Sequence, residues 1–240
     1  YYKYNFFILL LKFLEFFTHK FNTILNKHLL VFLICLSLAF YSKGQTLVSM
    51  ETSAGEVILK LYDDTPIHKA NFLKLVNKGY YDSLLFHRVI KDFMMQGGDP
   101  NSRNASRYKK LGTGSPGYTL EAEIGPQHIH KRGALAAARN EDKINPKKKS
   151  NGSQFYIVTG RKYPRKYMPR FEETRGEKYS EKELIAYETI GGSPHLDGLY
   201  TVFGELMRGL NIVEKVCNAP VNGASRPLKD IYILKIKVIR

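Results

Sequence analysis

The 240-residue sequence has no tryptophan and only two cysteines, so several kinds of protein are excluded at once. Cys35 and Cys217 are separated by most of the chain, which leaves no Cys-x-x-Cys pair, no zinc-ligand spacing and no disulfide framework. The Walker A lysine motif, His-Glu-x-x-His and Gly-x-Ser-x-Gly are also absent, which removes the standard arrangements of nucleotide hydrolases, zinc proteases and serine hydrolases. We expect neither a metal ion nor an organic cofactor.

Acidic residues are scarce at the start of the chain. Residues 1–44 contain one acid, Glu15, and residues 29–40 form an apolar run with a basic flank before it and small residues after it, as in a secretory signal peptide. A helix of about 12 residues rises about 18 Å, less than the roughly 30 Å of a bilayer core, so a cleaved signal is favoured over a permanent span. We predict a signal peptide near 27–44 and export, to a periplasm in preference to secretion or membrane tethering.

Residues 1–26 contain a further apolar stretch, and the chain begins with Tyr1 where a start methionine would stand. We interpret this segment as sequence upstream of the true start. A membrane-embedded segment is the alternative.

The composition is that of a globular protein. The chain is 43% hydrophobic and 25% charged, with 19 glycines and 10 prolines, which excludes collagen-like and disordered chains. Its length fits one main domain, 45–240. The 37 Lys and Arg against 22 Asp and Glu give a net charge of +15, and residues 147–149 are all lysine. No aromatic residues interleave with these lysines, so we predict a solvated loop and no nucleic-acid partner.

Alternating apolar residues indicate strands along most of the domain. The expected strands are 47–51, 56–61, 86–90, 93–96, 118–123, 133–137, 154–158, 200–205 and 230–239. Thr65 as N-cap and Pro66 begin a helix that ends at Gly79, and a second short helix fits 209–216. Many short strands with two helices and no βαβ alternation predict a mainly β fold, a closed or nearly closed antiparallel barrel.

One segment departs from this pattern. Residues 161–194 are rich in charge and show no strand alternation, and 180–189 fits a helix capped by Ser180 with Glu183 three residues on. We interpret 161–194 as a charged, partly helical insertion.

Two other motifs have ordinary interpretations. Residues 112–117 match Gly-x-Gly-x-x-Gly, but strand-like residues follow where a dinucleotide site needs a helix, so we predict a glycine-rich surface loop. His128 and His130 lie two apart, but no further metal ligands can be identified. We interpret both histidines as surface residues.

The most informative stretch is 86–99, FHRVIKDFMMQGGD. Strand alternation places Phe86, Arg88 and Ile90 on one face. It likewise places Phe93 and Met95 on one face, with Met94 and Gln96 on the other. Two plain barrel strands do not explain an arginine among apolar residues, because a charge beside an apolar surface is costly without a partner. A site for an amide carbonyl does explain it.

This stretch resembles the signature F-H-R-x-I-x-x-F-M-x-Q-G-G-D of the cyclophilin family of peptidyl-prolyl cis-trans isomerases. Residues 151–157 (NGSQFYI) are similar to the family's N-G-S-Q-F-F-I, and the resemblance continues in 196–198 (LDG) and 201–204 (TVFG). It covers 46 to about 239 without the insertion. It implies an eight-stranded antiparallel closed β-barrel capped by two α-helices, with the site on the outer face.

Carried over position by position, the resemblance also implies the site residues. Arg88 is the catalytic arginine and Gln96 orients it. The substrate-binding residues that it implies are Phe93, Met94, Ala138, Arg139, Gln154, Tyr156, His195, Leu196 and Tyr200.

Four of these positions depart from the family's pattern. Tyr156 replaces a phenylalanine and adds a hydroxyl to the pocket floor. Arg139 replaces an asparagine, a change that a main-chain contact would survive. His195 replaces a tryptophan, which argues against strong binding of the inhibitor cyclosporin, whereas Tyr200 replaces a histidine and keeps an aromatic wall.

The function that follows is acceleration of X-Pro rotation in exported client proteins. Rotating a peptide bond costs about 18–20 kcal/mol and requires no nucleophile, only preferential stabilisation of the twisted state, which Arg88 would supply. The alternative is a proline-segment-binding chaperone on the same fold with little turnover. We expect a monomer whose partners are proline-containing polypeptides, with the insertion beside the pocket, where it would select clients.

Overall fold

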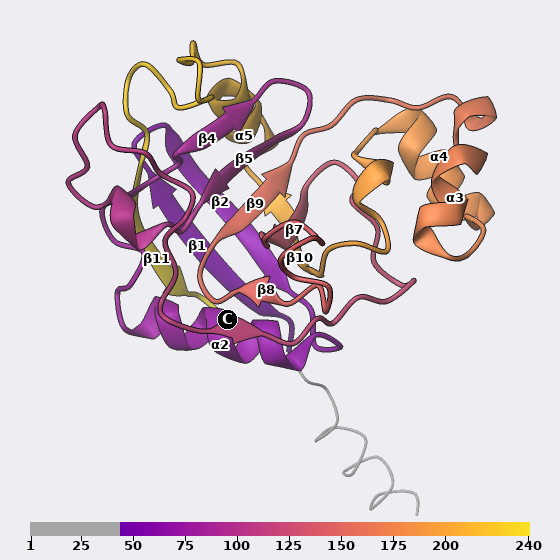
Figure 1. Ribbon diagram of the computed structural model, residues 1–240, viewed down its shortest axis with the longest axis horizontal. Helices are drawn as coiled ribbons and strands as arrows, with labels where there is room; N and C mark the ends of the chain where they lie inside the picture. Colours follow the sequence, from indigo (N-terminus) through magenta and orange to yellow (C-terminus); the bar gives the residue numbers. More distant parts are fainter. Residues whose placement is uncertain (1–43) are drawn as a thin grey trace, which may run out of the picture. The chain divides into compact units, whose positions relative to one another are not determined.

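The computed structural model describes residues 44–240, of which 45–240 form one compact unit. The segment 1–26 and nearly all of the predicted signal peptide lie outside the described residues. The main feature is a nine-stranded antiparallel sheet that curls around a hydrophobic core (Figure 1). Its strands are β1 (Thr46–Thr52), β2 (Gly55–Leu61), β3 (Leu84–Leu85), β4 (Arg88–Ile90), β5 (Met94–Gly97), β7 (Ala134–Ala137), β9 (Phe155–Val158), β10 (Val202–Arg208) and β11 (Tyr232–Val238). A second, two-stranded sheet consists of β6 (Thr119–Leu120) and β8 (Ser150–Asn151).

The sheet bends almost into a barrel because one short segment supplies both of its edges. The strand order is β3-β11-β1-β2-β10-β7-β9-β5-β4, and only Phe86 and His87 separate β3 from β4. Residues 84–90 therefore pair with β11 at one end and with β5 at the other. The prediction of a mainly antiparallel barrel is confirmed, although the expected strand 86–90 is broken and the barrel is not strictly closed.

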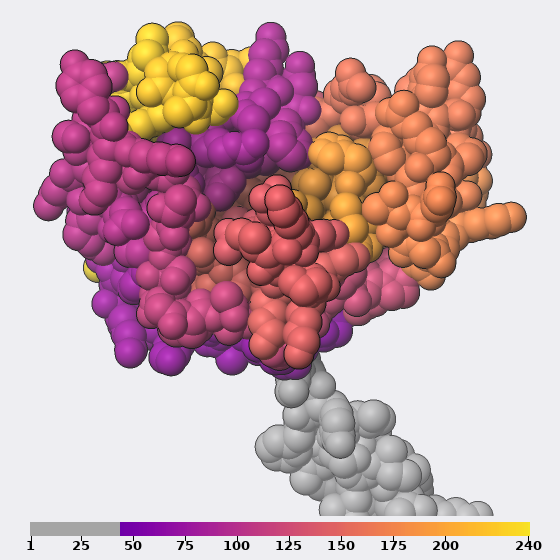
Figure 2. Space-filling model, in the orientation of Figure 1, coloured from indigo at the N-terminus to yellow at the C-terminus, as the bar shows by residue number. Residues whose placement is uncertain are grey.

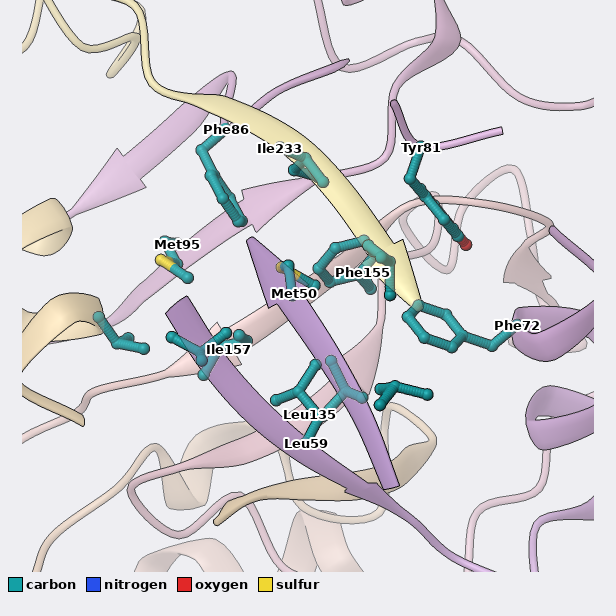
Figure 3. Packing of buried hydrophobic residues seen from close by; sticks show 14 of the residues in the cluster. Met50, Leu59, Phe72, Tyr81, Phe86, Met95, Leu135, Phe155, Ile157 and Ile233 are labelled. Atoms are coloured by element: carbon teal, nitrogen blue, oxygen red, sulfur yellow. The ribbon is translucent and has the colours of Figure 1, made fainter. Parts of the chain in front are cut away.

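The core follows from the two-residue period of the strands. Met95, Leu135, Phe155 and Ile157 point inward from β5, β7 and β9, and each is at most 1% exposed. They meet residues from the opposite wall, such as Met50 of β1, in the cluster drawn in Figure 3. The residues between them along the same strands face outward, and the candidate site is built on that outer face.

Helices cover the barrel at two places. Helix α2 (Pro66–Asn77) contributes Phe72, Leu75 and Val76 to the core, and α5 (Leu210–Cys217) contributes Val213, Val216 and Cys217. Figure 1 shows α2 below the sheet and α5 above it. The two helices expected from the sequence are confirmed. Among the helices of residues 44–240, none combines the length and the apolar composition that crossing a bilayer requires.

The start of α2 is capped differently from the sequence expectation. The Thr65 side chain makes no capping hydrogen bond. The carboxylate of Glu123, from a distant loop, accepts the backbone N–H groups of Ile67 at 2.9 Å and His68 at 2.8 Å. A negative group at a helix N-terminus satisfies free donors and interacts favourably with the helix dipole. Glu123 thus takes the role predicted for Thr65.

Replacing Glu123 with alanine is expected to lower the free energy of unfolding by about 2 kcal/mol, because it removes the N-cap and the 2.6 Å contact of the carboxylate with the buried His68 ring. Thr65→Val removes the hydroxyl of a buried residue whose bond to the Tyr62 carbonyl is long, at 3.4 Å, and is expected to cost only about 0.5 kcal/mol. Urea denaturation of the two variants measures both effects. A larger loss in Thr65→Val than in Glu123→Ala would return the capping role to Thr65.

The insertion forms its own small core beside the barrel. It contains α3 (Pro169–Arg175) and α4 (Glu181–Thr189), which Figure 1 shows at the right of the sheet. The expected cap of α4 is present, since the Glu183 carboxylate accepts the Ser180 backbone N–H at 2.7 Å. The members of its hydrophobic cluster are Ile129, Tyr163, Met168, Tyr179 and Tyr187. Because Ile129 precedes β7, this cluster attaches the insertion to the barrel domain.

Candidate active site

A row of outward side chains crosses four neighbouring strands. Arg88 of β4 lies opposite Gln96 of β5, Gln96 lies opposite Tyr156 of β9, and Tyr156 lies opposite Ala136 of β7. Directly paired residues of adjacent strands point to the same face of a sheet. The register therefore gathers a cation, an amide and an aromatic ring on the outer face, with the arginine on the edge strand.

This row opens into a pocket of about 120 Å³. The residues that line it are Arg88, Phe93, Met94, Gln96, Ala138, Arg139, Tyr156, Leu196 and Tyr200. Met94, Tyr156 and Leu196 are buried and form its apolar base. In Figure 2 the loop after β7 (coral, 140–149) stands forward of the sheet, with the purple β4 and β5 above it. Nine of the eleven predicted site residues meet here.

Arg88 is held at the pocket by a chain of amides. The guanidinium of Arg88 donates to Gln96 Oε1 at 3.4 Å, and Gln96 Nε2 donates to Gln154 Oε1 at 2.9 Å. Gln154 Nε2 in turn donates to the carbonyls of Gly112 and Gly114 at 3.0 and 2.7 Å. Gln154 is therefore buried behind the pocket and positions Gln96. Arg88 itself is exposed, so its cation remains available to a ligand.

The glycine-rich loop 112–117 has a structural role in this chain. A Cβ on Gly114 would lie 2.0 Å from the Asp99 carboxylate, so only glycine allows the loop to approach. That approach brings two backbone carbonyls to Gln154. The loop is thus a support for the predicted orienting glutamines.

The predicted sharing of a face was wrong for Phe86 with Arg88 and for Phe93 with Met95, but Met94 and Gln96 do share the outer face. Phe86 lies in the barrel core at 1% exposure, whereas Arg88 points outward, because the strand breaks at Phe86 and His87. Phe93 lies in the turn before β5 and packs on the outer cluster, while Met95 lies in the core. Simple alternation failed at these two irregular points.

His87, within the break, is 3% exposed, and neither of its ring nitrogens has a hydrogen-bond partner among residues 44–240. Burial lowers the pKa of His87 to about 4. The imidazole is therefore neutral in the folded protein, while the unfolded chain takes up a proton below its ordinary pKa of about 6.5. Protonation of the unfolded state destabilises the fold as the pH falls from about 6.5 to 4.

We expect this histidine to cost roughly 3 kcal/mol of stability between pH 7 and pH 4. In His87→Leu that part of the pH dependence should disappear, because no group titrates at this position. Chemical denaturation at pH 7, 5.5 and 4 measures the difference between the two proteins. Parallel stability curves would mean that His87 titrates normally in the fold.

Arg139 serves the pocket through its ring contact and its backbone. Its side chain is 3% exposed, donates to the Leu199 carbonyl at 2.7 Å and lies over the Tyr200 ring at 4.5 Å from the centroid. Arg139 therefore braces the Tyr200 wall. In the described part of the chain its backbone N–H and C=O have no partner, whereas both backbone groups of Ala138 are bonded to neighbouring residues. Main-chain contact with a peptide is thus open at Arg139.

His195 lies at the rim and does not line the pocket. It is exposed, and its ring centroid is 5.3 Å from that of Phe93. Burial lowers the pKa of its imidazole. The ring can widen the apolar rim beside Phe93.

The interpretation of the two neighbouring histidines as surface residues was wrong for His130. His128 stacks on Tyr62 and pairs with Asp64 at 2.8 Å, but His130 is 1% exposed. His130 Nε2 lies 3.0 Å from the Tyr156 hydroxyl, so the added hydroxyl of the pocket floor bonds an inner residue. The only sequence signal for this was the change from phenylalanine to tyrosine at 156.

A larger hollow of about 780 Å³ lies between the insertion and the loop before β7. It contains none of the predicted site residues, and Lys131 and Arg175 in its wall are already paired with Glu205 and Glu183. Within residues 44–240, no three His, Cys, Asp or Glu side chains gather so as to hold a metal ion. The 120 Å³ pocket is therefore the candidate active site.

Comparisons with known proteins identify the family of the chain. The sequence model for "Cyclophilin type peptidyl-prolyl cis-trans isomerase/CLD" matches residues 47–238. A Staphylococcus haemolyticus protein named as a peptidyl-prolyl cis-trans isomerase is 34% identical over 192 residues, covering 80% of this chain and 90% of that protein. A Streptococcus pyogenes protein named as a bifunctional phosphatase/peptidyl-prolyl cis-trans isomerase is 34% identical over 194 residues, and the match spans 38% of its length.

Solved structures show the same fold. The crystal structure of a cyclophilin type peptidyl-prolyl cis-trans isomerase from Cryptosporidium parvum aligns with a TM-score of 0.59 and 26% identity. The alignment covers 82% of this chain and 99% of that one.

Proposed function

Because the chain belongs to the cyclophilin-type peptidyl-prolyl cis-trans isomerase family, we propose that the 120 Å³ pocket binds the proline ring and that Arg88 drives the isomerisation. The observation that carries this proposal is the guanidinium of Arg88 at the mouth of an apolar pocket, held by Gln96. Met94, Tyr156 and Leu196 would grip the ring, with Phe93 and Tyr200 as walls. The peptide backbone would lie along Arg139.

The chemistry is non-covalent. In the planar amide the prolyl nitrogen shares its lone pair with the carbonyl, and rotation about the bond ends this sharing. The twisted nitrogen is then a better hydrogen-bond acceptor, so a fixed guanidinium stabilises the twisted state more than either planar isomer. Each 1.4 kcal/mol of that preference accelerates the exchange about tenfold. The fork of Arg88 offers several fixed donors, which lysine cannot copy.

The buried amide chain supports this role. Gln96 fixes the direction of Arg88, and Gln154 fixes Gln96 through two carbonyls of the loop 112–117. A preorganised cation needs little rearrangement when the bond twists. The buried apolar base excludes water from the ring, which strengthens the interaction.

We also propose that the clients are exported polypeptides. The support is the apolar run 29–40 with its basic flank, which has the layout of a signal peptide. Fractionation of cells expressing the full sequence tests this: the proposal expects a shortened protein beginning near Gln45 outside the cytoplasm. Full-length protein in the cytoplasm would contradict it.

An isomerase and a chaperone that only binds proline segments differ in the rate at which they exchange the cis and trans forms of a bound peptide. We expect the protein at substoichiometric concentration to accelerate cis-trans exchange of a short Ala-Pro peptide, measured by NMR exchange spectroscopy. Peptide binding without acceleration of the exchange would favour the hypothesis of a chaperone. A peptide in which alanine replaces the proline is the control for non-specific binding.

A further inference from the structure

A chain of buried hydrogen bonds runs from the pocket floor into the insertion. The Tyr156 hydroxyl lies 3.0 Å from His130 Nε2, and His130 Nδ1 lies 2.8 Å from Asp197 Oδ1. The hydroxyls of Tyr179 and Tyr187 donate to Asp197 Oδ2 at 2.8 and 2.5 Å. Tyr187 belongs to α4 and Tyr179 to the loop between α3 and α4. The Asp197 carboxylate thus links the pocket floor, through His130, to two tyrosines of the insertion.

The hydrogen bonds at Asp197 determine the direction of the whole chain. Its carboxylate accepts four donors: the backbone N–H and ring Nδ1 of His130, and the two tyrosine hydroxyls. Burial alone would raise the pKa of Asp197, but the hydrogen bonds from His130 and Tyr187 outweigh it and the pKa is lowered. An ionised carboxylate only accepts, so Nδ1 of His130 carries a proton. In the neutral imidazole, Nε2 then accepts from Tyr156, which fixes that hydroxyl.

All the side chains of this hydrogen-bonded chain are buried. His130, Asp197 and Tyr187 are at most 2% exposed, and Tyr156 and Tyr179 are 4% and 6% exposed. The rings are also packed, with Tyr179 and Tyr187 edge to face at 5.6 Å and His130 stacked on Tyr156 at 6.0 Å. Such a network is rigid when every member is satisfied and costly when one partner is lost. Removing one member therefore weakens the hold on its neighbours.

The insertion is held in place on the barrel side as well. Gly192, near its end, bridges to both Lys131 and Arg161, and Ser193 N–H donates to the His130 carbonyl at 2.8 Å. A Cβ on Gly192 would lie 2.7 Å from Tyr187 Cε1, so the return of the chain packs directly on that ring. His130 is consequently fixed through both its ring and its backbone by parts of the insertion and its exit.

We propose that Tyr179 and Tyr187 of the insertion, acting through Asp197 and His130, are positioning residues that hold the Tyr156 ring in place as the floor of the proline pocket. The inference rests on the proposed function of that pocket. It assigns the insertion a role in the affinity of the pocket for X-Pro segments without contact with the substrate. Tyr156 is the residue through which this effect must pass.

A double-mutant cycle tests the proposal in the otherwise unaltered protein. The double variant Tyr179→Phe/Tyr187→Phe keeps both rings and removes both donors to Asp197. We expect it to raise KM and the peptide Kd about fivefold with little change in kcat, because a misplaced floor weakens binding of ground and transition states alike. In a Tyr156→Phe background the same pair should change these values less than twofold, because the chain is already cut.

Tyr163→Phe is the matched control, since Tyr163 lies in the same cluster and its hydroxyl, among the described residues, makes no bond to Asp197. It should leave KM and Kd unchanged. All assays are made at a temperature at which circular dichroism shows every variant folded.

Equal losses in the two backgrounds, no loss in either, or an equal loss in Tyr163→Phe would each overturn the proposal, since a merely structural role gives additive effects. A wild-type protein that binds the peptide without accelerating exchange would refute the proposed function only. The cycle in Kd would then still decide the positioning role.

Discussion

Replacing Arg88 with alanine is expected to reduce kcat/KM for an Ala-Pro peptide by about 100- to 1000-fold, the range seen when one preorganised electrostatic donor is removed from an active site. The fold should be unaffected, because the side chain is exposed and its hydrogen bond to Gln96 is long, at 3.4 Å. Arg88→Lys keeps the charge but loses the fork, and we expect it to recover no more than about tenfold of the loss. A protease-coupled or NMR exchange assay gives the rates, and thermal unfolding gives the stability.

Two controls separate the transition-state role from a loss of structure. Lys91 is another exposed cation in the turn after β4, and Lys91→Ala should change kcat/KM less than twofold. A similar loss in Lys91→Ala would mean that general positive charge is responsible. An active Arg88→Ala protein would remove the guanidinium from the mechanism.

The largest expected effect on stability is that of Asp197→Asn. The carboxylate is 2% exposed and accepts four donors, whereas an amide in its place points one NH₂ at groups that also donate. Breaking a buried, paired network in this way usually costs about 3–5 kcal/mol. We expect a loss of about 3 kcal/mol in urea denaturation at pH 7. Most of this loss should be avoided when Asp197→Asn is combined with Tyr179→Phe and Tyr187→Phe, which remove the two hydroxyl donors.

The pH dependence gives this prediction a second test. The pKa of Asp197 is lower in the fold than in the unfolded chain, so its stabilising effect is complete above the unfolded value of about 3.9 and is lost as the pH falls through the lower folded value. Wild-type protein should therefore lose this contribution below about pH 4, and Asp197→Asn should lack that part of the acid transition. Identical acid transitions would show that the carboxylate is not specially stabilised. The effect of His87 falls in a separate range, from about 6.5 to 4.

The fold could be predicted from the sequence where local patterns agree with the tertiary structure. Strands β1 and β2 lie where the alternation in 47–51 and 56–61 predicts them. Helix α4 begins where the capping residues Ser180 and Glu183 predict its start. Prediction failed where long-range contacts decide. Glu123 caps α2 but lies 55 residues beyond His68, so no local pattern indicates the contact. The break at 86–87 arises because the segment pairs with a different strand at each edge of the sheet.

The site followed the same rule. Site residues within the three motifs came together with Ala138, Arg139 and Tyr200 from outside them, and nine of the predicted residues line one pocket. Gln154 lies behind the pocket because its side chain is hydrogen-bonded to Gln96 and to the glycine-rich loop. His130 was missed because its importance depends on Asp197 and Tyr156, which are distant along the chain. Only the unusual tyrosine at 156 hinted that a buried partner was needed.

The central claim is that Arg88 acts on the twisted state and not on binding. The most direct measurement compares wild type and Arg88→Ala with one Ala-Pro peptide, obtaining the Kd from NMR titration and the exchange rate of bound peptide from exchange spectroscopy in the same samples. The account predicts a Kd changed by less than about threefold and a bound exchange rate reduced at least about 100-fold. A Kd raised as much as the rate is lowered, or a rate that does not change, would contradict it.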